Sequence, residues 1–184
     1  MPVPPVIEAG TITLRPVAET DINEKYLNWL LDPEVNRYLE TRHHKQTLAL
    51  IRDFVHAKTD SIDEYLFAIS RADVGSHIGN IKIGPINTRH KLAEISLIIG
   101  DRSSWGGGFG SRAISEVTRF AFTMLGLNKV AAGLYAPNVG SERAFLKAGW
   151  RKEAVLHGHY ALDGAPCDLV LMGMWRSLWA QEAL

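Results

Sequence analysis

The chain has 184 residues, 46% of them hydrophobic and 22% charged, which is typical of a globular domain and excludes wholesale disorder. Its 20 basic and 20 acidic residues cancel, and this balance argues against a nucleic-acid partner, because phosphate binding needs an excess of positive charge. The single cysteine, Cys167, excludes an intrachain disulfide and a cysteine-based zinc site. Because the sequence has neither a signal-peptide pattern nor a membrane-spanning apolar run, we expect no membrane partner and a cytoplasmic location.

The first half of the chain mixes short strands with two amphipathic helices. Residues 1–10 are a Pro-rich lead-in that we expect to be flexible, and the alternation of Thr11–Arg15 predicts a strand. Asp21 is placed to cap a helix, which Asp32-Pro33 breaks. The other elements predicted in this half are a helix over Gln46–Ala57 and strands over Tyr65–Ser70 and Ser76–Ile83.

The second half gives clearer signals. A strand over Leu92–Gly100 leads through a glycine cluster into a strongly amphipathic helix, which Gly126 is placed to end. No repeat, charge block or linker divides the chain, so the pattern predicts one domain with a mixed α/β sheet. The other elements predicted here are a strand over Lys129–Tyr135, a helix that Asn138 caps and Gly149 ends, and strands around 150–161 and 167–175.

The glycine cluster is the most informative stretch, with four glycines in the five positions from Gly106 to Gly110. Glycine costs backbone entropy, but it lets successive N–H groups turn inward around an anion. The following helix adds its free N–H groups and the positive end of its dipole. The cluster therefore predicts a diphosphate cradle built from backbone, and a flexible loop whose glycines serve packing stays open as the alternative.

Two other nucleotide-binding motifs fit the cluster less well. A P-loop ends in Gly-Lys-Ser/Thr, and the cluster contains no lysine. Gly108-x-Gly110-x-x-Ala113 matches the dinucleotide fingerprint, but that motif needs an acidic residue about 20 positions later. The stretch from Asn128 to Asn138 holds no Asp or Glu, so the sequence argues against a nicotinamide cofactor.

Three segments, taken in order, carry a family resemblance. They are Ile12-Thr13-Leu14-Arg15-Pro16, Trp105-Gly106-Gly107-Gly108-Phe109-Gly110, and Asn138-Val139-Gly140-Ser141 with Phe145-Leu146-Lys147-Ala148-Gly149-Trp150. Together they resemble the GCN5-related N-acetyltransferases, most strongly the branch typified by the ribosomal-protein alanine acetyltransferases. The resemblance covers roughly residues 11–175, and the order and spacing of the segments make it specific.

The resemblance implies an α/β (α+β) fold with a central mixed, mostly antiparallel sheet of six to seven strands, flanked by about four helices. One N-acetyltransferase domain would span residues 11–177, followed by a C-terminal tail at 178–184. A splayed strand pair would hold acetyl-CoA as the co-substrate, without a metal. The residues implied to bind acetyl-CoA are Leu97, Ile98, Ile99, Trp105, Gly106, Gly107, Gly108, Phe109, Gly110, Ser111, Asn138 and Ser141.

The resemblance also implies direct transfer of the acetyl group to a primary amine, which needs a base because such an amine is mostly protonated at pH 7. Glu94 is our candidate base, acting through water, since its neighbours Ala93 and Ile95 would make a buried carboxylate costly. As the alternative, Glu94 faces solvent or pairs with Lys91 or Lys82.

A proton donor for the departing sulfur is less evident. The wider family often carries a tyrosine late in the helix that Asn138 begins, and Phe145 stands there in this chain. Ser141 is our candidate acid, or at least a hydrogen-bond partner of the sulfur. The alternative is that Ser141 and Asn138 serve only the first turn of the helix. Because a phenyl ring cannot donate a proton, a non-catalytic CoA-binding or sensing domain stays open as the second function.

The acceptor is open between a protein N-terminus, an amino sugar and an aminoglycoside. Residues 19–64 hold ten acidic and six basic residues, a mild excess that suits a cationic amine. Two histidine pairs, His43-His44 and His157 with His159, are further candidates for the acceptor site. Apolar residues near the C-terminus leave both a monomer and a homodimer open; they are Trp175, Leu178 and Trp179.

Overall fold

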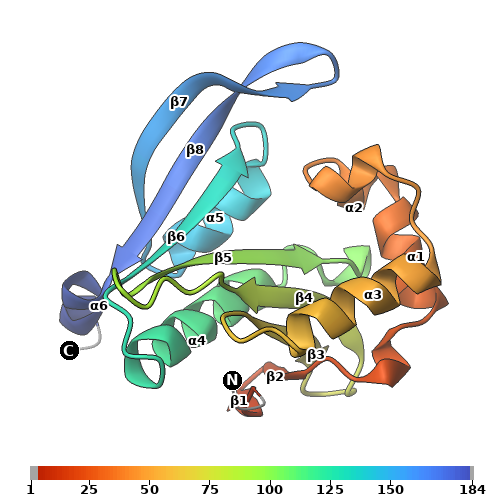
Figure 1. Cartoon of the computed structure of the whole chain (residues 1–184), viewed down its shortest axis with the longest axis horizontal. Helices are drawn as coiled ribbons and strands as arrows, with labels where there is room; N and C mark the ends of the chain where they lie inside the picture. The colour runs from red at the N-terminus through yellow and green to blue at the C-terminus, as the bar shows by residue number, and fades with distance from the viewer. Residues whose placement is uncertain (1–3, 183–184) are drawn as a thin grey trace.

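The computed structural model describes residues 4–182 of the chain, and its centre is one sheet of eight strands in the order β1-β2-β3-β4-β5-β6-β8-β7 (Figure 1). The strands are β1 (Ile7–Ala9), β2 (Ile12–Pro16), β3 (Tyr65–Arg71), β4 (His77–Ile83), β5 (Leu92–Ile99), β6 (Lys129–Tyr135), β7 (Arg151–Leu162) and β8 (Ala165–Trp175). All neighbouring strands run antiparallel except β5 and β6, which run parallel. The predicted mixed, mostly antiparallel sheet is therefore confirmed.

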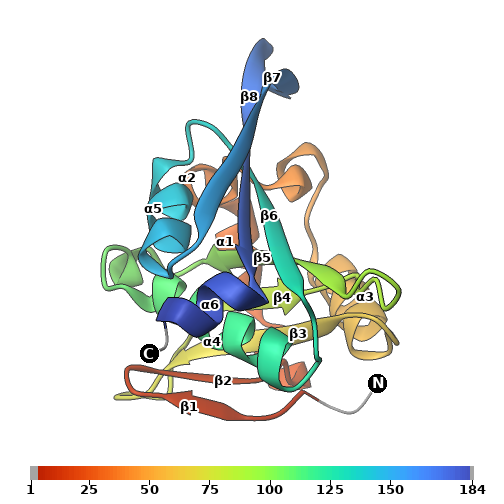
Figure 2. The same cartoon turned by 90° about the vertical axis from the view of Figure 1, so that its left-hand side faces the viewer.

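Six α-helices accompany the sheet in the described part of the chain. They are α1 (Glu24–Leu31), α2 (Pro33–Asn36), α3 (Leu48–Thr59), α4 (Phe109–Thr123), α5 (Val139–Lys147) and α6 (Arg176–Glu182). Three short 3-10 helices cover Glu19–Asp21, Glu40–His43 and Arg102–Ser104. Helix α4 lies against one face of the sheet, and α1 and α3 lie on the other (Figure 2).

The element count exceeds the six to seven strands and about four helices expected, mainly because both ends of the chain are ordered. The lead-in expected to be flexible contributes β1, whose Ile7 pairs with Leu14 of β2, while residues 1–3 lie outside the described range. The tail expected from residue 178 belongs to α6, which packs on the core through Leu178 and Trp179. Both ends of the chain are ordered because their apolar side chains pack into the same core.

Helix α4 is fixed firmly under the sheet. Its predicted apolar stripe is confirmed over the helix, since Ala113, Ile114, Val117 and Ala121 are fully buried, but Met124, which was expected to continue the stripe, is 70% exposed just after the helix ends. Burying each of the larger side chains contributes about 1.5–3 kcal/mol, several times the roughly 0.6 kcal/mol of thermal energy. The first turn of α4 therefore has a defined position beside the end of β5.

The helix predicted to start at Asp21 is capped by another residue. The side chain of Asn23 accepts the Tyr26 amide and is the N-cap of α1. The Asp21 side chain is buried and accepts two hydrogen bonds from Arg15, at 2.6 and 2.8 Å, and one from the Ala18 amide. Arg15 is a charged, bidentate partner on β2. Asp21 therefore binds this strand instead of capping α1.

The sheet splits in its middle. Strands β5 and β6 pair only over Leu92↔Lys129, Ala93↔Val130 and Glu94↔Ala131. Beyond Glu94, β5 continues to pair with β4, and β6 continues to pair with β8. The predicted splayed strand pair is therefore present, and its opening lies between the second half of β5 and the second half of β6 (Figure 1).

Candidate active site

The edge of β5 that faces the opening carries free backbone groups. The Glu94 carbonyl accepts the Gly84 amide, and the Gly100 amide donates to the Ile78 carbonyl, so the even-numbered residues of β5 point toward β4. Because the direction of the backbone N–H and C=O groups alternates along a strand, those of Leu97 and Ile99 point toward the opening. Of the three residues predicted here, Ile98 belongs to the set directed at β4, and its side chain packs against the α1–α3 layer.

The glycine loop ends in the first turn of α4. Gly106 and Gly108 have φ values of +78° and +79°, in the left-handed region that glycine adopts without strain, and Gly108 is the N-cap of α4. The amides of Phe109, Gly110 and Ser111 have no hydrogen-bond acceptor among the described residues. An array of free amides at the positive end of a 15-residue helix is the arrangement that binds phosphate.

The loop and β5 lie side by side. The indole N–H of Trp105 donates to the Ile99 carbonyl at 2.7 Å, so Trp105 ties the loop to the end of the strand. A Cβ placed on Gly110 would lie 3.6 Å from Leu97 Cδ1 and 3.9 Å from Ala144 Cβ of α5. The amide array is therefore continuous with the free edge of β5, and α5 borders both.

Asn138 and Ser141 stand at the start of α5, immediately after β6. The Asn138 side chain accepts the Ser141 amide at 3.2 Å, so the predicted N-cap at Asn138 is confirmed. The Ser141 hydroxyl has no hydrogen-bond partner in the described part of the chain. Phe145 is completely buried, and its ring centroid lies 4.7 Å from that of Trp150, so the position of the missing tyrosine faces the core.

Glu94 is exposed, which differs from the apolar setting that its sequence neighbours indicated. Ala93 and Ile95 point into the core on the α4 side, and Glu94 points to the opposite face because side chains alternate along a strand. Lys82 pairs with Glu64 at 2.7 Å, so it is not the partner of Glu94. Glu94 stands at the last β5–β6 pair, where the sheet opens.

A tyrosine cluster that the sequence analysis missed covers the same face. Tyr135 ends β6, and its hydroxyl donates to Glu40 Oε1 at 2.5 Å and accepts from Arg42 Nη2 at 3.0 Å. The ring of Tyr160, from β7, stacks on Tyr135 with centroids 4.5 Å apart, and Tyr38 lies 6.0 Å from Tyr135 on the other side. No local motif marks these residues, because they come from three separate segments that only the fold brings together.

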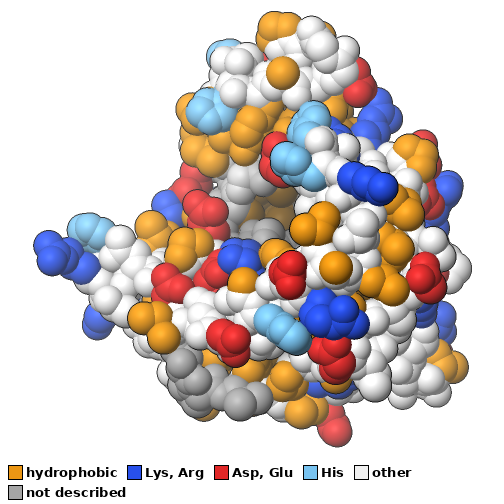
Figure 3. All heavy atoms as spheres, turned by 45° about the vertical axis from the view of Figure 1, so that its right-hand side comes forward, with side chains coloured by type: hydrophobic (Ala, Val, Ile, Leu, Met, Phe, Trp, Pro, Cys, Tyr) orange, Lys and Arg blue, Asp and Glu red, His pale blue; other side chains and the backbone are white. Residues whose placement is uncertain are grey.

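The surface is hollowed between the β7–β8 hairpin and the lobe formed by α1–α3, and acidic, histidine and hydrophobic side chains surround the hollow (Figure 3). Of the predicted histidines, His43 ends a 3-10 helix next to His44, and His157 binds Asp168 at 2.9 Å with its side chain 86% exposed. Hydrogen bonds from the Gly158 amide and from His157 lower the pKa of Asp168. His157 is therefore fixed to the hairpin surface.

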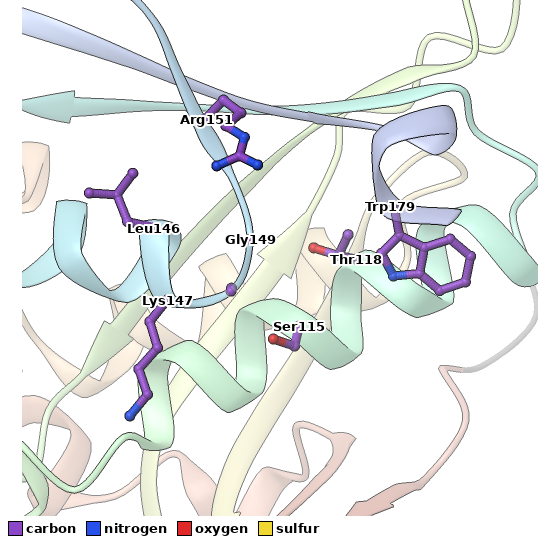
Figure 4. Close-up of a pocket in the computed structure, with 8 residues that line it drawn as sticks. Ser115, Thr118, Leu146, Lys147, Gly149, Arg151 and Trp179 are labelled. Carbon is purple, nitrogen blue, oxygen red and sulfur yellow. The ribbon is translucent and has the colours of Figure 1, made fainter. Parts of the chain in front are cut away.

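A cavity of about 400 Å³ lies between α4 and the end of α5 (Figure 4). Its lining includes Ser115 and Thr118 from α4, and the cations Lys147 and Arg151. The Lys147 ammonium is 3.7 Å from the place that a Cβ on Gly108 would take, so this cation reaches the glycine loop. Positive charge and free amides thus occur together at the start of α4.

Two absences concern only residues 4–182. No helix in this range is long and apolar enough to cross a membrane. In the same range, no group of three or more His, Cys, Asp or Glu side chains is arranged to hold a metal ion. Cys167 is a buried free cysteine.

Comparisons with known proteins agree with this geometry. Residues 11–151 match the family model described as an acetyltransferase (GNAT) domain. The chain is 31% identical over 167 residues to the "Uncharacterized N-acetyltransferase YoaA" of Bacillus subtilis, covering 89% of this chain and 93% of that protein. It is 26% identical over 172 residues to the "Uncharacterized N-acetyltransferase p20" of Bacillus licheniformis, covering 92% of this chain and 95% of that protein.

Solved structures share the fold at lower identity. A spermidine N-acetyltransferase from Vibrio cholerae, in complex with CoA and spermine, superposes with a TM-score of 0.80 at 20% identity, covering 92% of this chain and 98% of that one. A GNAT-family acetyltransferase from Bacillus anthracis gives a TM-score of 0.81 at 19% identity, covering 94% and 99%. With the family model matching most of its length, the chain belongs to the GNAT family of acetyltransferase enzymes.

Proposed function

We propose that this enzyme transfers the acetyl group of acetyl-CoA directly to the primary amine of a small, cationic acceptor. One observation carries the proposal: the free amides at the start of α4 are continuous with the free edge of β5. The amides of the loop Trp105–Ser111, with Lys147, would bind the two phosphates of CoA. The pantetheine arm would pair with the backbone of Leu97 and with the Ile99 amide, since the Ile99 carbonyl already accepts the Trp105 indole, and would occupy the opening.

The residues around the opening then divide the chemistry. Glu94, through a water, takes the proton of the acceptor ammonium, and the free nitrogen lone pair attacks the thioester carbon. A β5 amide hydrogen-bonds to the carbonyl oxygen as negative charge develops there. The C–S bond then breaks with its electron pair on sulfur. The Ser141 hydroxyl gives its proton to the sulfur, and the nitrogen, which carries two protons after the attack, returns one of them to Ser141 through water, leaving an N-acetylated amine and free CoA.

The nature of the acceptor follows from charge. The face beside the opening carries the carboxylates of Glu40 and Glu94, which attract an ammonium ion. The V. cholerae spermidine acetyltransferase and its bound spermine add polyamines to the acceptors that the sequence left open. We therefore place polyamines first, and retain amino sugars, aminoglycosides and protein N-termini of the ribosomal-protein alanine acetyltransferase type as further candidates.

Two measurements on the purified chain test the proposal. Titration calorimetry with CoA should give a 1:1 isotherm, and a thiol-release assay with acetyl-CoA should respond to at least one amine among spermidine, glucosamine, kanamycin and an Ala-initiated peptide. Absence of CoA binding would contradict the proposal entirely. CoA binding without thiol release from any amine would favour the second candidate, a non-catalytic CoA-binding domain, which Phe145 in place of the family tyrosine keeps under consideration.

A further inference from the structure

We propose that the hydroxyl of Tyr160 binds the acceptor amine at the mouth of the split sheet and directs its nitrogen toward the thioester. The inference rests on the proposed acetyl transfer and assigns a substrate-binding role to a residue outside the motifs of the sequence. Four observations carry it: where the hydroxyl lies, how its ring is held, which charges surround it, and that no described residue binds it.

The hydroxyl lies over the strand where the sheet opens. Glu94 and Ala131 form the last β5–β6 pair, and Gly133 is two residues further along β6. A Cβ on Gly133 would lie 3.7 Å from the Tyr160 hydroxyl oxygen. The missing side chain therefore lets the phenol approach the backbone of β6 directly at the start of the opening.

The ring of Tyr160 is held in place. It stacks on Tyr135 at 4.5 Å with an interplanar angle of 26°, and Tyr135 is itself fixed by Glu40 and Arg42. The pairing of β7 with β8 is irregular between Leu156 and Tyr160, as in a β-bulge. Bulges occur beside active sites, where they redirect side chains, and Tyr160 is the first paired residue after this one.

The charges around the hydroxyl suit an ammonium ion. Burial, followed by the negative charges of Glu40 and Glu94, raises the pKa of Tyr160, so the phenol stays neutral at physiological pH. Arg42 lies over the Tyr135 ring, with its guanidinium carbon 4.9 Å from the centroid. Arg37 also lies over the cluster, 5.5 Å from the Tyr38 centroid, and it pairs with Asp163 at 3.9 Å. Three carboxylates against two guanidinium groups leave a negative site for the amine.

The Tyr160 hydroxyl has no hydrogen-bond partner among residues 4–182, although the hydroxyl of neighbouring Tyr135 has two. A phenol oxygen can accept an N–H from the amine. With Glu94 on the same face of the sheet, the amine would have a hydrogen-bond acceptor on one side and a base on the other. This arrangement orients the nitrogen lone pair toward the opening, where the thioester lies.

The experiment compares the intact enzyme with Tyr160→Phe, which keeps the ring and its stacking and removes only the hydroxyl. Tyr65→Phe is the matched control, because Tyr65 is a buried tyrosine on β3, packed edge-on against Phe120 of α4. Initial rates of thiol release are measured with acetyl-CoA and each amine that the wild type accepts among spermidine, glucosamine, kanamycin and the Ala-initiated peptide. Thermal unfolding midpoints report whether either variant is destabilised.

We expect Tyr160→Phe to raise the acceptor KM at least tenfold and to leave the acetyl-CoA KM within twofold of the wild type, with Tyr65→Phe unchanged in both. An unchanged acceptor KM in Tyr160→Phe, or equal rises in the KM values of both substrates, would overturn the inference while acetyl transfer stands. A wild type that releases no thiol with any amine would instead overturn the proposed function, and this inference with it.

Discussion

Ser141 and Glu94 approach the opening of the sheet from different sides, and their surroundings give them different chemistry. Ser141 lies in the first turn of α5, where the Asn138 cap binds its amide and leaves its hydroxyl free among the described residues. Glu94 is exposed at the last β5–β6 pair, within the electrostatic reach of Tyr160. In the proposed reaction, Ser141 protonates the sulfur and Glu94 deprotonates the amine.

Replacing Ser141 by Ala removes the hydroxyl proposed to protonate the sulfur. We expect kcat to fall about a hundredfold, the low end of general acid catalysis, with little change in the Kd for CoA because the cap from Asn138 binds only the backbone. Thiol-release kinetics and calorimetry measure the two quantities. Ser61→Ala, in the loop before β3, is the control, and equal kcat values in both variants would exclude Ser141 as the acid.

Replacing Glu94 by Gln removes the proposed base and keeps the shape of the side chain. We expect kcat/KM at pH 7 to fall about a hundredfold, and the loss to shrink at high pH, where more of the amine is already neutral. The pH–rate profile of the variant checks this. Glu8→Gln, on the surface of β1, should keep the wild-type profile, and a Glu94→Gln loss independent of pH would argue against a base.

At the scale of elements, the loop before α4 depends on backbone conformation rather than on side chains. Gly108→Ala places a Cβ on a left-handed N-cap, which costs about 1–2 kcal/mol and turns the following amides away from their positions. We expect the Kd for CoA to rise about tenfold. Gly10→Ala is a matched control, because Gly10 has a φ of +62°, open space around it, and a place in the distant β1–β2 turn.

Calorimetry with CoA separates the two glycine variants. Both should lose a similar amount of stability toward urea, since both force alanine into the same backbone region. If Gly108→Ala binds CoA as tightly as Gly10→Ala does, the N-terminal amides of α4 are not the phosphate site.

Helix α5 differs from the wider family at Phe145, and burial explains why restoring the tyrosine would not restore an acid. Phe145→Tyr places a hydroxyl in a completely buried site beside Trp150, so we expect a loss of about 2 kcal/mol in the free energy of unfolding and no gain in kcat. Urea unfolding and thiol release test this. Phe54→Tyr changes an exposed side chain of α3 and should leave the free energy of unfolding within about 0.5 kcal/mol of the wild type. A higher kcat in Phe145→Tyr would contradict this account.

At the scale of the whole molecule, much of the architecture could be predicted from the sequence. The stripe of α4, the strand over Leu92–Ile99 and the cap at Asn138 each follow from a local period or a capping residue, and the structure contains all three. The glycine loop was also predictable, because glycine clusters before a helix have a specific backbone use.

The face proposed to bind the acceptor could not be predicted in the same way. Tyr135, Tyr160 and Glu40 are far apart in the chain and have no spacing that signals a site. The exposure of Glu94 depends on which face of β5 the helices cover, which is a tertiary property. The strand at Ile7–Ala9 was missed because its own three residues have no strand pattern. It forms because it pairs with the next strand, β2.

A buried network between β2, the 3-10 helix Glu19–Asp21 and β4 makes the folded state sensitive to acid. His77 Nδ1 lies 3.5 Å from the buried Asp21, and His77 Nε2 lies 2.9 Å from Asn80 Oδ1. Burial lowers the pKa of His77 below its usual 6.5. Burial alone would raise the pKa of Asp21, but the hydrogen bonds from Arg15 and the Ala18 amide and the charge of His77 lower it overall.

Both groups therefore bind protons more weakly in the folded chain than in the unfolded chain, so the free energy of unfolding falls on acidification. The loss due to His77 begins as the pH drops through 6.5, and that due to Asp21 follows below its usual value of 3.8. Urea unfolding at pH 7.5 and 5.5 should show a smaller loss in His77→Gln than in the wild type. Equal losses would remove His77 as the cause.

The short β5–β6 ladder has a mechanical consequence. Among residues 4–182, three residue pairs are the only strand pairing between strands β1–β5 and strands β6–β8 of the sheet. A pantetheine chain lying in the gap would contact both halves of the sheet and add interactions between them. Binding in the gap would then stabilise the folded enzyme as a whole, so that the melting temperature should rise with the concentration of CoA.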